Sequence, residues 1–249
     1  MTGGGTGIGR ATAELVLSRG GSVVLNGRRE AVLADAARAL DPTGARVAVV
    51  AGDVADPATS LEVVRVAEER FGGLDVFVNN AGYFVPTGFE DHGPEDFRGF
   101  VDTILAGTFY GAQAAVPALK RRGGGAIVNV GSMWAERAIG ATPSSAYSAA
   151  KAGVHALTRN LAIELADASI RVNAVAPAVV ETPVYGTFMT PEEVREVLPT
   201  FGGLHPVGRN AQPEEVAEAI LFLASPASSF VTGSILPVDG GVLAGQGAS

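Results

Sequence analysis

The sequence has no cysteine among its 249 residues. Disulfide bonds, zinc–thiolate sites and thiol nucleophiles are therefore excluded. It also has no apolar run near the ~20 residues that a membrane span needs, and its N-terminus, MTGGGTGIGR, lacks the apolar segment of a signal peptide. Basic residues are fewer than acidic ones, 18 against 26, so the net charge of −8 disfavours nucleic acid and anionic membranes as partners. We expect a cytoplasmic protein.

Hydrophobic residues make up 47% of the chain and charged residues 18%, which excludes an intrinsically disordered protein. Glycine is abundant at 33 residues, about twice its usual share, and it predicts many tight turns or close backbone approaches. The length allows one large domain or two small ones. Since no linker, repeat or low-complexity tract interrupts the sequence, we expect a single domain over residues 1–249.

Short apolar runs alternate with longer stretches rich in Ala, Leu and Glu. The runs are apolar on both faces, as expected of parallel strands between two helix layers, and the alternation predicts a doubly wound, Rossmann-like α/β sheet. The predicted strands are Ser22–Asn26, Arg46–Ala51, Leu74–Asn79, Ala126–Val130, Ile170–Val175 and Ser234–Val238. The predicted helices are Ile8–Ser18, Glu30–Leu40, Pro57–Phe71, Pro94–Arg121, Ser145–Ala166 and Pro213–Ala224. The irregular stretch 183–207, with a short helix signal at Pro191–Leu198, has the position of a substrate lid.

Residues 2–9 read TGGGTGIG, with Gly3, Gly7 and Gly9 in a G-x-x-x-G-x-G pattern. Glycines let the backbone approach a pyrophosphate, and the helix that follows offers free N–H groups and the positive end of its dipole. Taken alone, the pattern also fits a glycine-rich disordered N-terminus. Such a loop normally follows a strand, and here only Met1 precedes it.

Further motifs follow the predicted strands in order. They are Asp53-Val54, Asn79-Asn80-Ala81-Gly82, Ser132, Tyr147-Ser148-Ala149-Ala150-Lys151, the run NAVAPAVVET from Asn173 to Thr182, and Val238-Asp239-Gly240-Gly241. A Y-x-x-x-K sequence alone is common by chance, but here it is in register with the glycine loop, NNAG and a serine. The series resembles the short-chain dehydrogenase/reductase superfamily, in its compact single-domain branch, over nearly the whole chain.

The resemblance implies a catalytic set of Ser132, Tyr147 and Lys151. Tyr147 and Lys151 are four residues apart and share a helix face, so the ammonium, together with the positive nicotinamide of a bound cofactor, is expected to favour the phenolate over the phenol, whose ordinary pKa is near 10. By resemblance, Lys151 also holds the nicotinamide ribose, and Ser132 binds the substrate oxygen. Ser144 and Ser145 lie closer to Tyr147 in sequence, but they follow Pro143 and are more simply explained as N-caps.

The resemblance also implies a cofactor, for which we expect NADP(H), with NAD(H) as the alternative. An NAD enzyme of this fold needs an acid directly after the strand that corresponds to Ser22–Asn26, where the acid accepts the ribose 2′-hydroxyl. Here that place is Gly27, followed by Arg28 and Arg29, and a guanidinium can hold a 2′-phosphate. The implied cofactor-binding residues are Gly3, Gly5, Thr6, Gly7, Ile8, Arg28, Asp53, Val54, Asn80, Ala81, Gly82, Tyr147, Lys151, Pro177, Val180 and Thr182.

Two positions depart from the family pattern. Ile104 stands where many members carry an asparagine, which puts the usual proton relay in doubt. Ala178 follows Pro177 in place of a glycine, which is tolerated if its φ is negative. The three histidines show no metal-ligand spacing, and we expect no metal. His155 is expected at the helix surface or an interface, and His205, in the lid, is a candidate substrate contact.

These observations predict an NADP(H)-dependent oxidoreductase that transfers a hydride between the nicotinamide and a small carbonyl or alcohol substrate, with Tyr147 as acid/base. A 3-oxoacyl thioester reductase and a sugar dehydrogenase are alternatives in the same class, and a non-catalytic dinucleotide-binding protein is the alternative outside it. The apolar and aromatic residues near Ser132 and in the lid favour a substrate with an apolar body. The resemblance further implies a homotetramer.

The strand that leads into the glycine loop is missing or truncated in this sequence. Without it, the strands Ser22–Asn26 and Leu74–Asn79 would each face an unpaired edge, at roughly 1–3 kcal/mol for each buried group without a partner. We therefore expect the natural product to start upstream of Met1, with an apolar strand of some five to eight residues.

Overall fold

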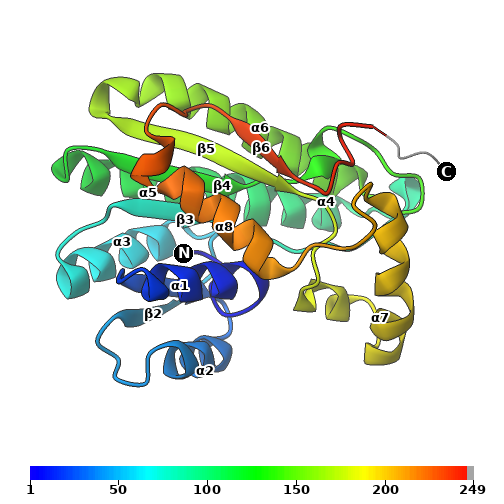
Figure 1. The fold of residues 1–249 in the computed structure, drawn as a ribbon, viewed down its shortest axis with the longest axis horizontal. Helices are drawn as coiled ribbons and strands as arrows, with labels where there is room; N and C mark the ends of the chain where they lie inside the picture. The colour runs from blue at the N-terminus through cyan, green and yellow to red at the C-terminus, as the bar shows by residue number, and fades with distance from the viewer. Residues whose placement is uncertain (246–249) are drawn as a thin grey trace.

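The structure is a computed structural model that describes residues 1–245. These residues form six parallel strands and eight α-helices, and helices separate successive strands along the chain (Figure 1). In order they are α1 Gly7–Ser18, β1 Val23–Gly27, α2 Glu30–Leu40, β2 Val47–Ala51, α3 Pro57–Phe71, β3 Val76–Asn79, α4 Pro94–Phe100, α5 Gly107–Arg121, β4 Gly125–Val130, α6 Ser145–Glu164, β5 Ile170–Pro177, α7 Pro191–Val197, α8 Pro213–Ala224 and β6 Ile235–Val238. The predicted doubly wound α/β fold is confirmed.

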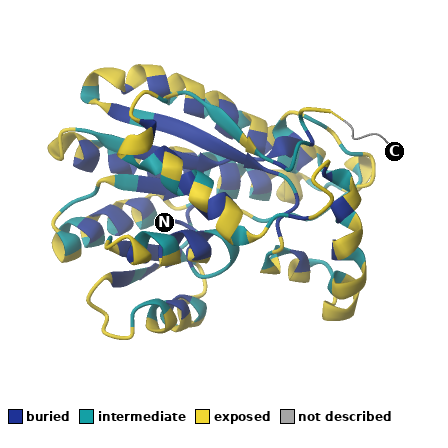
Figure 2. Ribbon diagram, viewed as in Figure 1, coloured by how far each residue is buried: buried dark blue, intermediate teal, exposed yellow. Residues whose placement is uncertain are grey.

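Helices cover both faces of the sheet because successive strand residues point to opposite sides. On β4, Ile127 packs into a core shared with α3, α5 and α6, whereas the next residue, Val128, packs into a core shared with α8. Helices α1 and α2 extend this second layer over β1 and β2. Figure 2 shows the result: the long strand β5 is buried, and the exposed residues lie on the outer faces of the helices.

The strands divide into two hydrogen-bonded groups, β1–β2 and β3–β4–β5–β6. Met1 and Thr2 lie between the groups. The Asn26 N–H donates to Met1 O at 3.0 Å, and the Thr2 N–H donates to Val78 O at 3.1 Å. The edges that were expected to be unpaired are therefore partly filled by these two residues.

The predicted single helix Pro94–Arg121 is wrong in one detail. Between α4 and α5 the chain widens into a π-helical turn, Val101–Ala106. Gly107, which follows it, packs so closely on Val54 that an added Cβ would lie 2.7 Å from Val54 Cγ2. The apolar periodicity continues through the turn, so the pattern could not separate one helix from two. π-Helical turns are frequent at functional sites.

No helix among residues 1–245 is both long enough and apolar enough to cross a membrane.

Candidate active site

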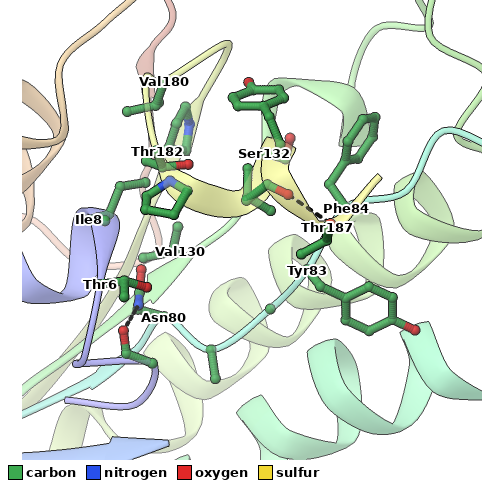
Figure 3. A pocket seen from close by; sticks show the side chains of 18 of the residues that line it. Thr6, Ile8, Asn80, Tyr83, Phe84, Val130, Ser132, Val180, Thr182 and Thr187 are labelled. Carbon is green, nitrogen blue, oxygen red and sulfur yellow. Dashed lines mark hydrogen bonds between the residues drawn. The ribbon is translucent and has the colours of Figure 1, made fainter. Parts of the chain in front are cut away.

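A cavity of about 980 Å³ lies at the carboxyl ends of the strands, where ligands bind in open α/β sheets. Figure 3 shows the glycine-loop residues Thr6 and Ile8 on one side of it and Ser132, Phe84 and Tyr83 on the other. Every residue predicted for catalysis or cofactor binding lines this cavity: Gly3, Gly5, Thr6, Gly7, Ile8, Arg28, Asp53, Val54, Asn80, Ala81, Gly82, Ser132, Tyr147, Lys151, Pro177, Val180 and Thr182.

The glycine loop presents an open helix N-terminus to the cavity. Helix α1 begins at Gly7, its N-cap Thr6 makes no side-chain cap, and its first turn carries no acid. Gly3 and Gly7 have φ of +62° and +52°, which favours glycine, and a Cβ at Gly9 would lie 2.3 Å from Gly3 O. Free N–H groups and close backbone approach suit a phosphate, so these residues fit the pyrophosphate of a dinucleotide.

Thr2 holds this loop against the end of β3, a role that the sequence analysis missed. Its buried hydroxyl accepts hydrogen bonds from Asn80 N at 2.9 Å and Ala81 N at 3.0 Å. In return, Asn80 Nδ2 donates to Thr2 O at 2.9 Å and to Gly3 O at 3.2 Å. The NNAG segment is therefore fixed to the glycine loop by side chains of both. No signal distinguished Thr2 from any other residue next to a glycine.

Tyr147 and Lys151 lie on one face of α6, as predicted, with the Lys151 ammonium 5.7 Å from the centre of the Tyr147 ring. Lys151 is only 4% exposed, and its Nζ donates to Val130 O at 2.6 Å. Burial lowers the pKa of Lys151 to about 8. The ammonium is thus held at the end of β4, beside the cavity, and is predominantly charged at pH 7.

In the protein alone, without a nicotinamide, the pKa of Tyr147 is raised rather than lowered. The side chain is partly buried at the cavity wall, and burial raises its pKa to about 12, although Ser132 acts in the opposite direction. Desolvation of the phenolate outweighs the attraction of a lysine whose nitrogen is bonded elsewhere.

Ser132 follows β4 directly and is 2% exposed. It caps the short 3-10 turn Met133–Ala135, where its Oγ accepts from Trp134 N at 3.3 Å. Ser144 is the N-cap position of α6, but its side chain makes no cap. Since Ser132 lines the cavity together with Tyr147, whereas Ser144 and Ser145 are not among its lining residues, the geometry favours Ser132 over the two later serines.

Aromatic rings form much of the remaining wall. The Phe84 ring lies edge-on to Tyr147, with centroids 5.0 Å apart, and also meets Trp134 at 5.9 Å and Phe188 at 6.0 Å. Trp134 Nε1 donates to Thr142 Oγ1 at 3.0 Å, so its polar atom is already paired. The wall also includes residues of the segment 183–207: Pro183, Val184, Tyr185, Gly186, Thr187, Phe188, Met189, Val197, Thr200, Phe201 and Leu204.

Behind Tyr147 the protein is apolar. Ile104 is 1% exposed and packs with Phe100, Ala150 and Val154, in a cluster that includes the Tyr147 ring. An isoleucine offers no hydrogen bond, so this side of the phenol has no polar side chain at the position where related sequences carry asparagine. Ala178 avoids the left-handed region of φ, so the condition for tolerating it beside Pro177 is met.

Two expectations about histidines are wrong. His155 is 3% exposed, not on the helix surface, because its ring packs on the backbone of Gly131. His205 does not line the cavity. It belongs to the segment 183–207 but is buried, and its Nε2 accepts from Val179 N at 3.3 Å. Among residues 1–245, no group of three or more His, Asp or Glu could hold a metal ion.

The doubly wound sheet and the open helix N-terminus at the carboxyl ends of its strands are typical of dinucleotide-binding folds. The family model described as enoyl-(acyl carrier protein) reductase matches residues 3–243. The chain belongs to the short-chain dehydrogenase/reductase superfamily, and it is an NAD(P)-dependent enzyme that acts on CH–OH groups.

Known relatives match nearly the whole chain. The chain is 44% identical to a cis-4-hydroxycyclohexanecarboxylate dehydrogenase of Sinomonas cyclohexanicum, covering 98% of this chain and 95% of the relative. It is 38% identical to a cyclohexanol dehydrogenase of an Acinetobacter species, covering 96% and 92%. A crystal structure of a short-chain type dehydrogenase/reductase from Mycobacterium marinum has a TM-score of 0.89 at 32% identity, covering 97% of this chain and 93% of that one.

The raised pKa of Tyr147 predicts how the free protein titrates. With a pKa of about 12 against 10.0 for an ordinary phenol, Tyr147 contributes stability that is fully present below pH 10 and is lost as the pH rises toward 12. Denaturant unfolding should therefore show a steeper loss of stability in this range for the wild type than for Tyr147→Phe. Tyrosinate difference spectra that show Tyr147 ionising below pH 10, in folded protein without cofactor, would contradict this result.

Proposed function

We propose that the protein is an NADP(H)-dependent dehydrogenase that interconverts a secondary alcohol and a ketone on a compact apolar body, in the simplest case a saturated ring. The observation that carries the proposal is that the Ser132, Tyr147 and Lys151 side chains open into the same cavity as the glycine loop. A hydride donor bound at that loop and a proton donor at Tyr147 would then face one substrate.

Each of the three side chains has a distinct task in ketone reduction. The Ser132 hydroxyl donates a hydrogen bond to the substrate oxygen, and Tyr147 transfers its phenolic proton to that oxygen. The nicotinamide, when bound, supplies the hydride. A pKa of about 12 keeps Tyr147 protonated near neutral pH, which suits a proton donor. In alcohol oxidation the phenol first loses its proton to water in the open cavity, and the Lys151 ammonium stabilises the phenolate. The phenolate then accepts the proton of the alcohol hydroxyl, and a bound nicotinamide would accept the hydride.

The lining of the cavity supports a ring-shaped apolar substrate. Phe84, Trp134 and Phe188 form a rigid aromatic wall next to Tyr147, and two relatives are named as dehydrogenases of cyclohexane-derived alcohols. A sugar would leave its hydroxyls against these rings without partners, at a cost of roughly 1–3 kcal/mol for each buried group.

A carrier-bound acyl thioester is disfavoured by the charge pattern. Docking of an acidic carrier needs a free basic patch, and the basic cluster of the sequence is Lys120-Arg121-Arg122. Arg121 forms an ion pair with Glu68 at 2.7 Å, and Arg122 forms one with Asp75 at 2.8 Å. Two of the three cations are thus neutralised within the chain itself.

NADP(H) is proposed over NAD(H) because the end of β1 offers cations and no acid. Gly27, Arg28 and Arg29 line the cavity there, and a guanidinium can bind a 2′-phosphate through two hydrogen bonds. The expected location remains the cytoplasm, in keeping with the acidic, cysteine-free composition.

The protein is proposed to form a homotetramer. Large apolar side chains stand exposed on the outer faces of several helices. They are Phe97 on α4, Phe109 on α5, Ile163 on α6 and Phe222 on α8. Symmetric association would bury such side chains against those of another copy.

Loss of the Tyr147 hydroxyl should stop the chemistry and leave the cofactor site intact. With cyclohexanol and NADP⁺, we expect Tyr147→Phe to lower kcat by at least about 100-fold, because the acid/base group is removed. The dissociation constant for NADPH should change by less than about twofold. A Tyr147→Phe variant with wild-type kcat would contradict the role of Tyr147 as the acid/base group. Galactitol and a 3-oxoacyl thioester, assayed in parallel on the wild type, should give the lower kcat/KM.

The cofactor preference can be reversed at Gly27. The nearest atom to a Cβ built there is Leu33 Cδ2 at 3.5 Å, an ordinary contact, so a side chain fits. We expect wild-type kcat/KM to favour NADPH over NADH by at least about tenfold, and Gly27→Asp to favour NADH, because the carboxylate accepts the ribose hydroxyl and repels the phosphate. Gly27→Ala is the matched control for bulk and should keep the wild-type preference. Equal kcat/KM for the two cofactors in the wild type would refute the preference.

The assembly can be measured directly. Light scattering at micromolar concentration should give about four times the chain mass of 25.3 kDa. Phe109→Asp, which places a charge on α5, should yield smaller species. Glu14→Lys, a charge change at an exposed polar site on α1, is the control and should remain tetrameric. A wild-type mass of one chain would count decisively against the tetramer.

A further inference from the structure

His155 is a buried polar side chain that the catalytic scheme does not use. It lies on α6, and its imidazole is 3% exposed. The two ring nitrogens are both engaged. Nε2 accepts the backbone N–H of Ser132 at 3.4 Å, and Nδ1 lies 3.3 Å from Glu136 Oε1.

These two partners are the ends of one turn. Ser132 is the N-cap of the 3-10 turn Met133–Ala135, and Glu136 is its C-cap. The turn carries Trp134 into the cavity wall. A single imidazole therefore bridges the start and the end of the segment that presents both the Ser132 hydroxyl and the Trp134 ring.

The bridge requires a neutral imidazole. A nitrogen that accepts a backbone N–H carries no proton, so the proton belongs on Nδ1, where it can be donated to the Glu136 carboxylate. Burial, together with the positive charges of Lys151 and Arg159, lowers the pKa of His155 to about 4. The contacts therefore persist at neutral pH.

Gly131 leaves space for the His155 imidazole because it has no side chain. A Cβ at Gly131 would lie 2.2 Å from His155 Nε2 and 3.1 Å from Val175 O. Only glycine leaves room for the imidazole to reach the Ser132 N–H. The close approach between α6 and the end of β4 thus depends on both residues.

We propose that His155 is the positioning residue for Ser132 in this enzyme. Tyr147, Lys151 and His155 recur at intervals of four residues, so they share one face of α6. The helix then sets the place of Tyr147 and Lys151 directly and that of Ser132 through the imidazole. This inference rests on the proposed function, in which Ser132 binds the substrate oxygen.

Three substitutions separate the two contacts. The amide oxygen of His155→Gln can take the place of Nε2 and accept from Ser132, whereas the amide of His155→Asn reaches only the position of Nδ1. His155→Leu has a similar size and makes neither contact. Glu136→Gln keeps an acceptor for the Nδ1 proton and is the control outside the catalytic and binding residues.

With cyclohexanol and NADP⁺, His155→Leu and His155→Asn should lower kcat at least about tenfold, with the NADPH dissociation constant unchanged within about twofold. His155→Gln should recover kcat to within about threefold of wild type, and Glu136→Gln should match wild type. A residue that only fills space is not expected to change kcat while leaving the NADPH dissociation constant unchanged. Nor is kcat expected to recover only in His155→Gln, the variant that keeps the acceptor for the Ser132 N–H.

A second readout does not depend on turnover. Trp134 is the single tryptophan of the chain, so its fluorescence reports on the turn alone. Its emission should shift to longer wavelength in the Leu and Asn variants and stay unchanged in the Gln variant. If the wild type oxidises no alcohol, the proposed function fails, and the emission series still decides whether His155 holds the turn.

Wild-type kcat and emission in His155→Leu would overturn the proposal. So would equal kcat and equal emission in the Gln and Asn variants. If the Leu variant fails to fold, the Gln and Asn variants, which are both polar, decide the question between them.

Discussion

Lys151 carries its charge into the protein interior, where the carbonyl of Val130 accepts a hydrogen bond from it at 2.6 Å. A buried ammonium is costly unless it is paired, so this contact ties α6 to the carboxyl end of β4 at one place. The neighbouring turns of α6 then follow from helix geometry. Tyr147 faces the cavity one turn before Lys151, and His155 reaches the Ser132 backbone one turn after it. The site is thereby arranged along one helix face.

Much of this arrangement could be predicted from the sequence. The bounds of α2, α3 and α8 match the prediction because their ends carry local signals, such as Asp56, whose side chain accepts from Ala58 N, and Pro57 in the first turn. The predicted site residues meet in one cavity because the carboxyl ends of parallel strands lie along the same edge. The strands Val76–Asn79 and Ile170–Pro177 end near the predicted residues, with small shifts in length.

The remaining features depend on tertiary packing that local patterns do not encode. His155 follows Lys151 by one turn, but its burial is set by the missing side chain of Gly131, far away in sequence. The phenolate form of Tyr147 was expected to be favoured by the nearby lysine together with a bound nicotinamide. In the protein alone its pKa rises because burial disfavours the phenolate, and the Lys151 ammonium donates its hydrogen bond to the Val130 carbonyl instead. The π-helical turn at Val101–Ala106 keeps the apolar pattern of an ordinary helix, so the pattern could not predict it.

The sheet consists of two hydrogen-bonded groups of strands, β1–β2 and β3–β4–β5–β6, and this affects how a ligand stabilises the folded chain. Between β1 and β3, backbone hydrogen bonds of Met1, Thr2 and Gly4 connect the two groups of strands. The cavity spans this join, since Arg28 and Asp53 follow β1 and β2 whereas Asn80 and Lys151 belong to the other group of strands. A ligand that contacts both sides binds only while they stay aligned, and at 100 times its Kd it adds about 2.7 kcal/mol to stability. A bound ligand of this kind therefore also favours the arrangement in which the two groups of strands stay aligned.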